Sequence, residues 1–452
     1  MFLLLFLFLI LLLFCQNFQI RVHVGLITLV ILGILSYVLL YHKESSPCVI
    51  QVTEESIPNI SSENSTLENS VSVEPMTNVT EQTLSDPVIP LISDTSSVNI
   101  STVDQLSDLP ILKLSRHKKY LPAMMKESDD IISLLPNDGF LPDYKSFCWN
   151  DRMRTLRCIP GAYIAGMAKC GTTDLYAKLE WHHNILKPPA GKENMYWPRS
   201  RVGRKVGLAQ IGHRTKETFE SYTGRMTPED MREGNKDAII LDGTPCLLSD
   251  HREWETRYPW ATNPPYTNAD IIHFVSPQAK IVAMVRDPVE RLWSDYLYFD
   301  RGEKRTPDTF HEQLELEMDR FQSCLETRDL RHCCFSTKNS VKVQLSRGIY
   351  ICFLQDWREN FGDNLLVLTL EEYSERMVET LQRVYEFLEV TVDLVELQEM
   401  VDVSRTENVR QDSDVLQGDM LDETRVKLRT FYEPYNVMLA RYLQDRKYLF
   451  QY

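Results

Sequence analysis

The sequence predicts an α/β fold in which a P-loop-like parallel sheet is flanked by helices. Apolar runs of strand length at 238–242, 280–285 and 365–370 alternate with stretches of helical periodicity, a pattern typical of parallel βαβ units. A further apolar run at 163–165 is followed by a glycine-rich loop and then by a helix, the order of elements found around phosphate loops. We assign one α/β domain to residues 146–452, with further helices expected over 341–361, 376–388 and 422–443.

The glycine-rich loop, residues 166–171, has the composition of an anion cradle. Glycines allow successive amide N–H groups to turn toward one point at a helix N-terminus, where the helix dipole also favours negative charge. Lys169 adds a positive charge and is a candidate catalytic cation, and Thr172 and Thr173 add hydroxyl donors. Cys170 and Gly171 complete the candidate binding loop.

The spacing of Gly166 and Gly171 matches a nucleotide P-loop, but its lysine is displaced. An ATPase carries lysine directly after the second glycine, and this chain has Thr172 there. No aspartate motif for holding Mg²⁺ is evident in the sequence either. The loop therefore fits a single phosphate better than a triphosphate. A glycine-rich turn without a ligand is the alternative interpretation of the loop taken alone.

A second candidate anion site follows the apolar run at 280–285. Arg286 stands at the end of the run, Asp287 can cap the following helix and Pro288 suits its first position. Ser294 lies about two turns along that helix. Ligands of open α/β sheets bind beyond the carboxyl ends of strands, and arginine is well suited to phosphate. With the loop around Lys169, this site predicts a ligand that carries phosphates at both ends of a nucleoside.

Glu193 is a candidate general base. It lies in a loop bounded by prolines, between Lys192 and the aromatic pair Tyr196 and Trp197. We expect the rings to desolvate the carboxylate and so to raise its basicity, which suits a general base. An ordinary surface glutamate is the alternative.

The N-terminal third of the chain has a different composition. Residues 24–41 form an uncharged apolar run close to the ~20 residues of a membrane-spanning helix, and residues 1–23 are expected to be cytosolic or membrane-associated. Residues 42–145 are rich in polar residues and proline and are expected to form a disordered stem. The stem contains four glycosylation sequons, which indicate a lumenal segment, at Asn59, Asn64, Asn78 and Asn99. We expect a single-pass protein with a lumenal head.

Ten cysteines agree with an oxidising compartment. No histidines stand near them at zinc-finger spacing, so we expect disulfides rather than a metal site. The pairing stays open at this point. Four of the cysteines cluster within thirty residues, namely Cys324, Cys333, Cys334 and Cys352.

The formal net charge of −15 argues against a generic nucleic-acid-binding protein. A local basic stretch interrupts the acidic background and is either a solvated face or a binding site for an anionic substrate. It consists of Arg199, Arg201, Arg204, Lys205, Arg214 and Lys216.

These motifs resemble those of the Golgi carbohydrate sulfotransferases, which use 3′-phosphoadenosine 5′-phosphosulfate. Residues 165–173 resemble the family's 5′-phosphosulfate loop, and residues 285–295 resemble its 3′-phosphate motif. Lys192-Glu193 followed by aromatic residues is similar to the heparan sulfotransferase loop that carries the catalytic glutamate. The cysteine-rich flanks and the Cys-Trp-Asn sequence at 148–150 most resemble the N-acetylgalactosamine 4-sulfate 6-O-sulfotransferase branch.

The resemblance implies a type II Golgi membrane enzyme whose lumenal domain sulfates a glycosaminoglycan without a metal. The implied acceptor is the 6-hydroxyl of N-acetylgalactosamine 4-sulfate in chondroitin or dermatan sulfate. Glu193 would be the base, Lys169 would stabilise the leaving phosphate, and Arg286 and Ser294 would hold the 3′-phosphate.

One feature of the heparan enzymes is missing from the sequence. Their Lys-Gly-Arg triplet, which closes over the nucleotide, is absent, and Arg405 and Arg410 are candidates to replace it. The alternatives to the implied function are a heparan-type glycan sulfotransferase, a lumenal sugar kinase, and a non-catalytic glycan-binding protein that retains the fold.

Overall fold

The computed structural model describes residues 121–203, 216–251, 253–299, 305–336, 343–407 and 417–451. The expected membrane span at 24–41, the four sequons and most of the expected stem lie outside these ranges. Among the helices that the structure does describe, none combines the length and the apolar character needed to cross a membrane.

A parallel sheet forms the centre of the described domain and confirms the predicted α/β architecture. Its five strands lie in the order β4-β5-β3-β6-β7, and all neighbouring pairs run parallel. The strands are β3 (Ala162–Gly166), β4 (Ile185–Leu186), β5 (Ile239–Asp242), β6 (Lys280–Val285) and β7 (Leu365–Thr369). Their continuous apolar sequences are typical of strands that are buried on both faces.

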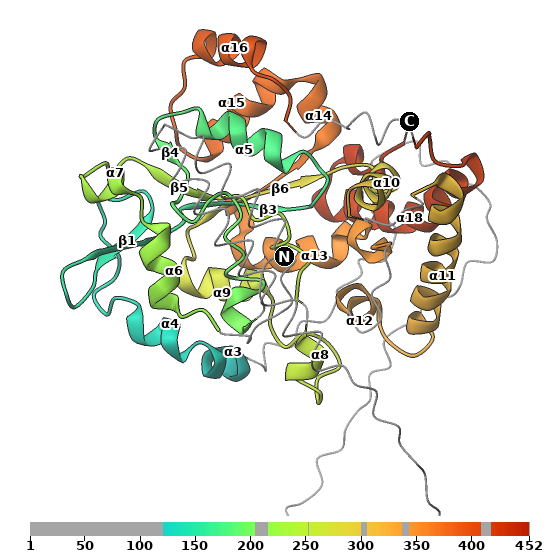
Figure 1. Cartoon of the computed structure of the whole chain (residues 1–452), viewed down its shortest axis with the longest axis horizontal. Helices are drawn as coiled ribbons and strands as arrows, with labels where there is room; N and C mark the ends of the chain where they lie inside the picture. Colours follow the sequence, from blue (N-terminus) through green and yellow to red (C-terminus); the bar gives the residue numbers. More distant parts are fainter. Residues whose placement is uncertain are drawn as a thin grey trace, which may run out of the picture. The chain divides into compact units, whose positions relative to one another are not determined.

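Helices cover both faces of this sheet, as Figure 1 shows. On one face lie α5 (Thr172–Glu180), α14 (Leu370–Glu375), α15 (Met377–Phe387) and α16 (Leu394–Val403). On the other face lie α9 (Asn268–Val275) and α13 (Tyr350–Phe361), with α6 (Phe219–Met226) near the β5 side. The helices α10 (Pro288–Phe299), α11 (Pro307–Leu325) and α18 (Asp422–Leu443) gather beyond the β6 side.

The remaining elements are short. An antiparallel hairpin of β1 (Phe147–Asn150) and β2 (Leu156–Ile159) precedes the sheet. The short helices are α3 (Leu121–Glu127), α4 (Asp129–Leu134), α7 (Glu229–Arg232), α8 (Trp254–Arg257) and α12 (Leu330–Phe335). The 3₁₀ turns are η3 (Ser200–Val202), η4 (Leu345–Gly348), η5 (Gly362–Asn364) and η6 (Arg446–Leu449).

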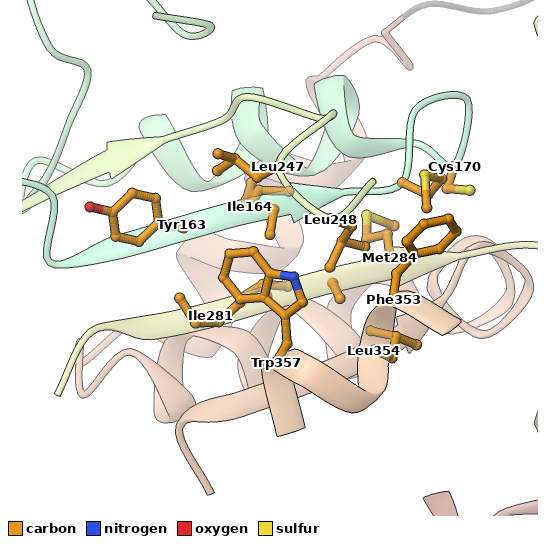
Figure 2. Close-up of a cluster of buried hydrophobic side chains, with 14 of the residues drawn as sticks. Tyr163, Ile164, Cys170, Leu247, Leu248, Ile281, Met284, Phe353, Leu354 and Trp357 are labelled. Carbon is orange, nitrogen blue, oxygen red and sulfur yellow. The ribbon is translucent and has the colours of Figure 1, made fainter. Parts of the chain in front are cut away.

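One part of the core lies between the sheet and α13, and another, with Leu175 of α5 and Leu381 of α15, covers the opposite face. Trp357, Phe353 and Leu354 of α13 face strand residues such as Ile281 and Met284, and these side chains are almost fully buried (Figure 2). Burial of large apolar side chains contributes roughly 1.5–3 kcal/mol each. This packing fixes the sheet, and hence the loops at its carboxyl edge.

Two predicted boundaries are wrong. The disordered stem was expected to reach residue 145, but α3 and α4 are ordered and pack on the domain. Met124 and Ile131 are buried, and the Asp130 carboxylate accepts a hydrogen bond from the Phe219 amide at 3.0 Å. The helix expected from residue 341 begins instead at Tyr350, after the 3₁₀ turn η4.

The expectation of disulfides is confirmed for two pairs. Cys148 pairs with Cys158 across the β1–β2 hairpin, and Cys324 pairs with Cys333 between α11 and α12. The described cysteines outside these bonds are Cys170, Cys246, Cys334 and Cys352, and all four are buried. Among the residues that the structure describes, no three histidine, cysteine, aspartate or glutamate side chains are grouped so that they could hold a metal ion.

Candidate active site

The predicted site motifs follow three adjacent strands. In the order β5-β3-β6, the carboxyl ends of the strands are Asp242, Gly166 and Val285, and parallel pairing places them along one edge. The phosphate loop therefore lies between the segment that follows β5 and Arg286, which follows β6. This edge is where ligands bind in open α/β sheets.

The phosphate loop depends on its two glycines. Gly166 has φ 144° and Gly171 has φ 81°, a region in which residues with a Cβ are strained. A Cβ on Gly171 would also lie 2.7 Å from Leu370 Cδ1, and one on Gly166 would lie 2.6 Å from the Pro245 carbonyl oxygen. The loop then enters α5 at Thr172, as predicted, so the first amides of a helix face this edge.

Lys169 lies against the helix that carries the second predicted anion site. Its Nζ is 3.7 Å from the centre of the Tyr298 ring, a cation–π distance. Tyr298 stands four residues after Ser294 on α10, so the two side chains share one face of that helix. Lys169 and Ser294, which belong to separate motifs in the sequence, are thus brought to one place.

Arg286 is close to the phosphate loop as well. Its carbonyl oxygen accepts a hydrogen bond of 2.8 Å from Tyr350, whose hydroxyl oxygen lies 3.9 Å from the Cys170 sulfur. Burial raises the pKa of the Cys170 thiol to about 12, and the positive charges of Arg291 and Arg286 oppose that rise. The thiol of Cys170 therefore belongs to the core, and its amide donates to the Met167 carbonyl at 3.2 Å.

The helix after Arg286 begins as expected. Asp287 caps α10 by accepting from the Val289 amide at 2.9 Å, and its own amide donates to Glu371 at 3.0 Å. Burial raises the pKa of the Asp287 carboxyl. The cap fixes the direction in which the strand end, and so Arg286, enters the helix.

Lys192 connects the phosphate loop to the candidate base. Its Nζ donates to Thr173 Oγ1 at 2.9 Å and lies 3.1 Å from Glu193 Oε1. The Lys192 side chain is 15% exposed and that of Glu193 is 37% exposed. A single ammonium group therefore joins the first turn of α5 to a carboxylate that solvent can reach.

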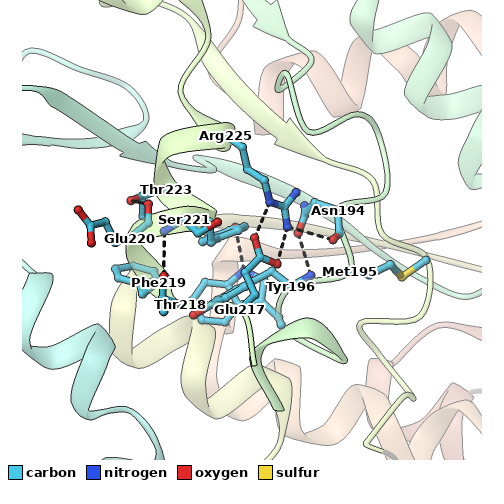
Figure 3. A network of polar contacts seen from close by, with 12 residues as sticks. Asn194, Met195, Tyr196, Glu217, Thr218, Phe219, Glu220, Ser221, Thr223 and Arg225 are labelled. Atoms are coloured by element: carbon cyan, nitrogen blue, oxygen red, sulfur yellow. Dashed lines mark hydrogen bonds and ion pairs between the residues drawn. The ribbon is translucent and has the colours of Figure 1, made fainter. Parts of the chain in front are cut away.

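The loop that carries Glu193 is fastened to the end of β5. The Gly243 amide donates to the Lys192 carbonyl at 2.9 Å, and the Asn194 side-chain amide donates to the buried Asp242 carboxylate. The Arg225 guanidinium donates a hydrogen bond to the backbone carbonyl of Asn194 at 3.4 Å (Figure 3). The same guanidinium pairs with Glu217 at 2.6 Å. Asp242 in turn accepts from the Thr244 amide at 2.9 Å, and burial raises the pKa of its carboxyl.

Comparison with known proteins identifies the family. The sequence matches the family described as "Sulfotransferase domain" over residues 160–433, more than half of the chain. The chain belongs to this sulfotransferase family. The resemblance of its motifs to sulfotransferases is thereby confirmed.

Individual relatives of this sulfotransferase carry one name. It is 30% identical over 427 residues to "Carbohydrate sulfotransferase 15" of Homo sapiens, covering 78% of this chain and 75% of the relative. It is 34% identical over 312 residues to the Mus musculus protein of the same name, covering 65% and 55%. Among solved structures, a sulfotransferase from Alicyclobacillus acidocaldarius is 20% identical, with TM-score 0.39, covering 64% of this chain and 96% of that chain.

One expectation about the sulfotransferase site needs correction. Tyr196 and Trp197 do not form the environment of Glu193, because both are buried in an aromatic cluster with Phe219 and Tyr222. Tyr196 stacks on Tyr222 with ring centres 4.0 Å apart. Glu193 instead pairs with Lys192 and is partly exposed, so the expected desolvation by these rings is wrong.

The basic stretch at 199–216 is largely used within the domain. Arg199 pairs with the buried Asp250 at 2.7 Å, Arg201 is itself buried against Tyr266, and Lys216 contacts Asp130 at 3.4 Å. Arg204, Lys205 and Arg214 lie outside the described residues. The described members of this stretch are therefore structural rather than a free anion-binding face.

Sequence reasoning missed the roles of Lys192 and Tyr298. Neither has a local pattern that predicts its partner, because Lys192 meets Thr173 and Tyr298 meets Lys169 only through the fold. The sequence also did not predict that residues 405–407 lie beside the first turn of α5. The Glu407 amide donates a hydrogen bond to the Asp174 carboxylate in that turn at 2.8 Å. Arg405 is on this segment, and Arg410 lies outside the described residues.

Proposed function

We propose that this sulfotransferase transfers a sulfuryl group from 3′-phosphoadenosine 5′-phosphosulfate to a sugar hydroxyl of a glycosaminoglycan. The observation that carries the proposal is the convergence of Lys169, the Lys192–Glu193 pair and Arg286 at one sheet edge. A cation-rich edge suits a donor with two phosphate ends, and an adjacent reachable carboxylate suits a hydroxyl acceptor.

The residues present fit such a donor. The loop from Gly166 to Gly171 leads into a helix N-terminus without room for larger side chains, as close approach to a phosphate requires. Lys169 and Thr173 would hold the 5′ end of the donor, with the loop amides of Gly171 and Thr172. Arg286 and Ser294 would hold the 3′-phosphate and so fix the register of the donor.

When bound, the donor supplies an activated sulfuryl group on a phosphate leaving group. Glu193 takes the proton of the sugar hydroxyl, whose oxygen forms the new bond to sulfur as the bond from sulfur to the phosphate oxygen breaks. Lys169 and the loop amides stabilise the negative charge that develops on that phosphate oxygen. Lys192 holds the Glu193 carboxylate beside Thr173, so that base and donor loop keep a fixed separation.

The proposed acceptor and location rest on the sequence motifs, and the name shared by the relatives supports a carbohydrate acceptor. We propose the 6-hydroxyl of N-acetylgalactosamine 4-sulfate in chondroitin or dermatan sulfate as the acceptor. We further propose that residues 24–41 anchor the enzyme in the Golgi membrane with the catalytic domain in the lumen, and that the sequons at Asn59, Asn64, Asn78 and Asn99 are glycosylated.

Transfer of radiolabelled sulfate by the purified chain to a panel of glycosaminoglycans, with a chelator present, tests the proposal. We expect labelled chondroitin 4-sulfate, and disaccharide analysis should place the new sulfate on the 6-hydroxyl. Transfer that needs ATP and Mg²⁺ would instead identify a sugar kinase. Glycan binding with no transfer would identify a binding protein, and label confined to heparan would identify a heparan-type enzyme.

The variant Glu193→Gln tests the base directly. It should lose turnover while donor binding, measured by calorimetry, stays within about twofold of wild type. Glu233→Gln, which alters an exposed glutamate after α7, is the matched control and should retain full activity. A Glu193→Gln enzyme with wild-type turnover would remove Glu193 as the base.

A further inference from the structure

A cavity of about 390 Å³ lies between α11, α12, η4 and the segment after β5. Small-molecule sites typically have volumes of roughly 300–1,000 Å³. The walls include Arg320 of α11 and Arg347 of η4, and the Cys324–Cys333 disulfide joins α11 to α12 within the lining. The disulfide therefore ties two of the elements that form the cavity, α11 and α12, to each other.

The cavity adjoins the candidate active site through the buried thiol of Cys246. The Cys246 carbonyl accepts a hydrogen bond at 2.8 Å from the amide of Asp250, which lines the cavity. The Cys246 sulfur lies 3.5 Å from the sulfur of Met195, two residues after the candidate base Glu193. The cavity wall and the loop that carries the base therefore both contact Cys246.

The lining includes arginines from three segments of the chain, namely Arg320 of α11, Arg328 of the turn before α12 and Arg347 of η4. Arg328 is exposed in the turn between α11 and α12, and the Arg320 side chain is 41% exposed. Guanidinium groups bind sulfate and carboxylate oxygens in a bidentate manner. An anion that enters the cavity would therefore meet arginines on more than one part of its wall.

The carboxylates of the lining offset only part of its positive charge. Asp250 pairs at 2.7 Å with Arg199, which is outside the lining, and Glu255 accepts a hydrogen bond from the Ser336 hydroxyl at 3.0 Å. Glu317 lies 3.4 Å from Arg320, and burial raises the pKa of its carboxyl to about 7, so that it is only partly ionised near neutral pH. The guanidinium groups therefore dominate the charge of the cavity.

We propose that this cavity binds an anionic group of the acceptor glycan. The group is carried either by the sugar that is sulfated or by the sugar next to it. The inference rests on the proposed function, and it adds the part of the fold that would recognise the charge already carried by the acceptor. The anion is a ring sulfate or a uronate carboxylate, which present the same oxygen chemistry to arginine.

Acceptor kinetics of the double variant Arg320→Gln/Arg328→Gln test this proposal. With chondroitin 4-sulfate we expect KM to rise at least tenfold while kcat changes less than threefold, because the loss falls on acceptor binding rather than on the reacting atoms. Donor binding should be unchanged. Arg232→Gln/Arg376→Gln, which alters arginines outside the cavity lining, is the matched control and should keep the wild-type KM.

Chemically modified acceptors distinguish the two anions. If the cavity reads a sulfate, the effect of the double variant disappears on desulfated chondroitin; if it reads a carboxylate, the effect disappears on carboxyl-reduced chondroitin 4-sulfate. If the wild-type enzyme transfers sulfate and the double variant has an unchanged KM, the cavity proposal is overturned and the proposed function is not. Absence of transfer by the wild-type enzyme would overturn the proposed function, and filter binding of the same glycans would then decide whether the cavity binds them.

A second inference comes from a different observation, the contact between Cys334 of α12 and Cys352 of α13. Their sulfur atoms lie 2.6 Å apart, and both residues are buried. Even carbon atoms attract best at about 3.5–4.0 Å, and sulfur is larger, so two separate thiols would repel at this distance. We infer that these two cysteines form a disulfide in the mature protein.

The bond would form by thiol–disulfide exchange. The two thiols lose two hydrogens and join through a new S–S bond, and a disulfide oxidant such as oxidised glutathione is reduced to two thiols. Such oxidants are present in the proposed lumenal compartment. The bond would attach α12, which lines the cavity, to the core helix α13.

Mass spectrometry of the full chain, denatured and digested without reductant, tests this inference. We expect the linked peptides of Cys324, Cys333, Cys334 and Cys352 to be lighter by one more pair of hydrogens than the Cys324–Cys333 bond alone explains. Cys170 and Cys246 serve as internal controls and should be alkylated. Alkylation of both Cys334 and Cys352 before reduction would overturn the inference.

Discussion

Lys192 Nζ lies 2.9 Å from Thr173 Oγ1, so a residue of the loop after β4 is bonded to the first turn of α5. The same ammonium lies 3.1 Å from Glu193 Oε1. The donor loop and the candidate base are therefore positioned by one side chain, although they are about twenty residues apart in the sequence.

Lys192→Met should lower kcat/KM roughly ten- to hundredfold. A hydrogen bond to a charged group contributes about 1.5–3 kcal/mol, which corresponds to this loss for the contact with Thr173. The contact with the partly exposed Glu193 is screened by solvent and adds little to it. Lys187→Met is the matched control. The Lys187 side chain is 48% exposed, and it forms a long surface ion pair of 3.7 Å with Glu180. Steady-state kinetics with the sulfate donor make the comparison. Equal activity of the two variants would show that the bridge does not position the site.

Asp242→Asn should reduce kcat at least about tenfold with little change in donor binding. Asp242 is fully buried and accepts from the Asn194 side chain and the Thr244 amide, so an amide in its place would set two NH₂ groups against each other. An unsatisfied buried polar group costs about 1–3 kcal/mol, and the cost falls on the loop that carries Glu193.

Thermal unfolding and kinetics measured together separate the two possible roles of Asp242. Asp237→Asn, at an exposed position just before β5, should leave both quantities unchanged. A lower Tm with an unchanged kcat for Asp242→Asn would show that Asp242 stabilises the fold without positioning Glu193.

The elements that could be predicted from the sequence are those determined by local pattern. The strand over 280–285 and the helix over 422–443 have the predicted bounds, because an unbroken apolar run and a regular helical period leave little choice. The phosphate loop was predictable for a similar reason, since glycine is required at Gly166 and Gly171 by backbone geometry.

The features that could not be predicted depend on contacts distant in sequence. The orientation of Tyr196 and Trp197 is decided by Phe219 and Tyr222, which lie more than twenty residues away. The helices α3 and α4 are short, and their hydrogen-bond and ion-pair partners, Phe219 and Arg257, are distant in sequence. The partner of Lys169, Tyr298, comes from the far end of α10. Pattern alone contains no information on such pairs.

Asp356→Asn should destabilise the domain by about 3–5 kcal/mol. Arg331 of α12 and Asp356 of α13 form a two-pronged ion pair with distances of 2.9 and 2.8 Å, and their side chains are 5% and 1% exposed. Removing one charge leaves the other buried without a partner, which is the costly case. Chemical denaturation measures the change.

Two further variants test the physical reason for this loss. Arg331→Met/Asp356→Leu removes both charges and should recover most of the stability, because apolar side chains of similar size can replace a buried ion pair. Arg376→Met breaks an exposed pair with Glu379, 61% and 73% exposed, and should cost less than about 1 kcal/mol. A double variant as unstable as Asp356→Asn would show that packing, not charge, accounts for the loss.

The free energy of unfolding should fall between about pH 4.5 and 7 because of Glu317. Burial raises the pKa of this carboxyl from 4.5 to about 7, so within that range the folded protein keeps a proton that the unfolded chain has released. Stability from this group is therefore complete below pH 4.5 and is lost as the pH rises through 7. A shift of this size corresponds to about 3 kcal/mol.

Glu317→Gln cannot ionise, so denaturation at about pH 5 and pH 8 should show a smaller loss of stability for the variant than for wild type. Glu312→Gln, an exposed position on the same helix, controls for the loss of a carboxylate and should follow the wild-type pH dependence. If Glu317→Gln lost as much stability as wild type, Glu317 would be ionised in the folded protein throughout this range, and its charge would count against anion binding in the adjoining cavity.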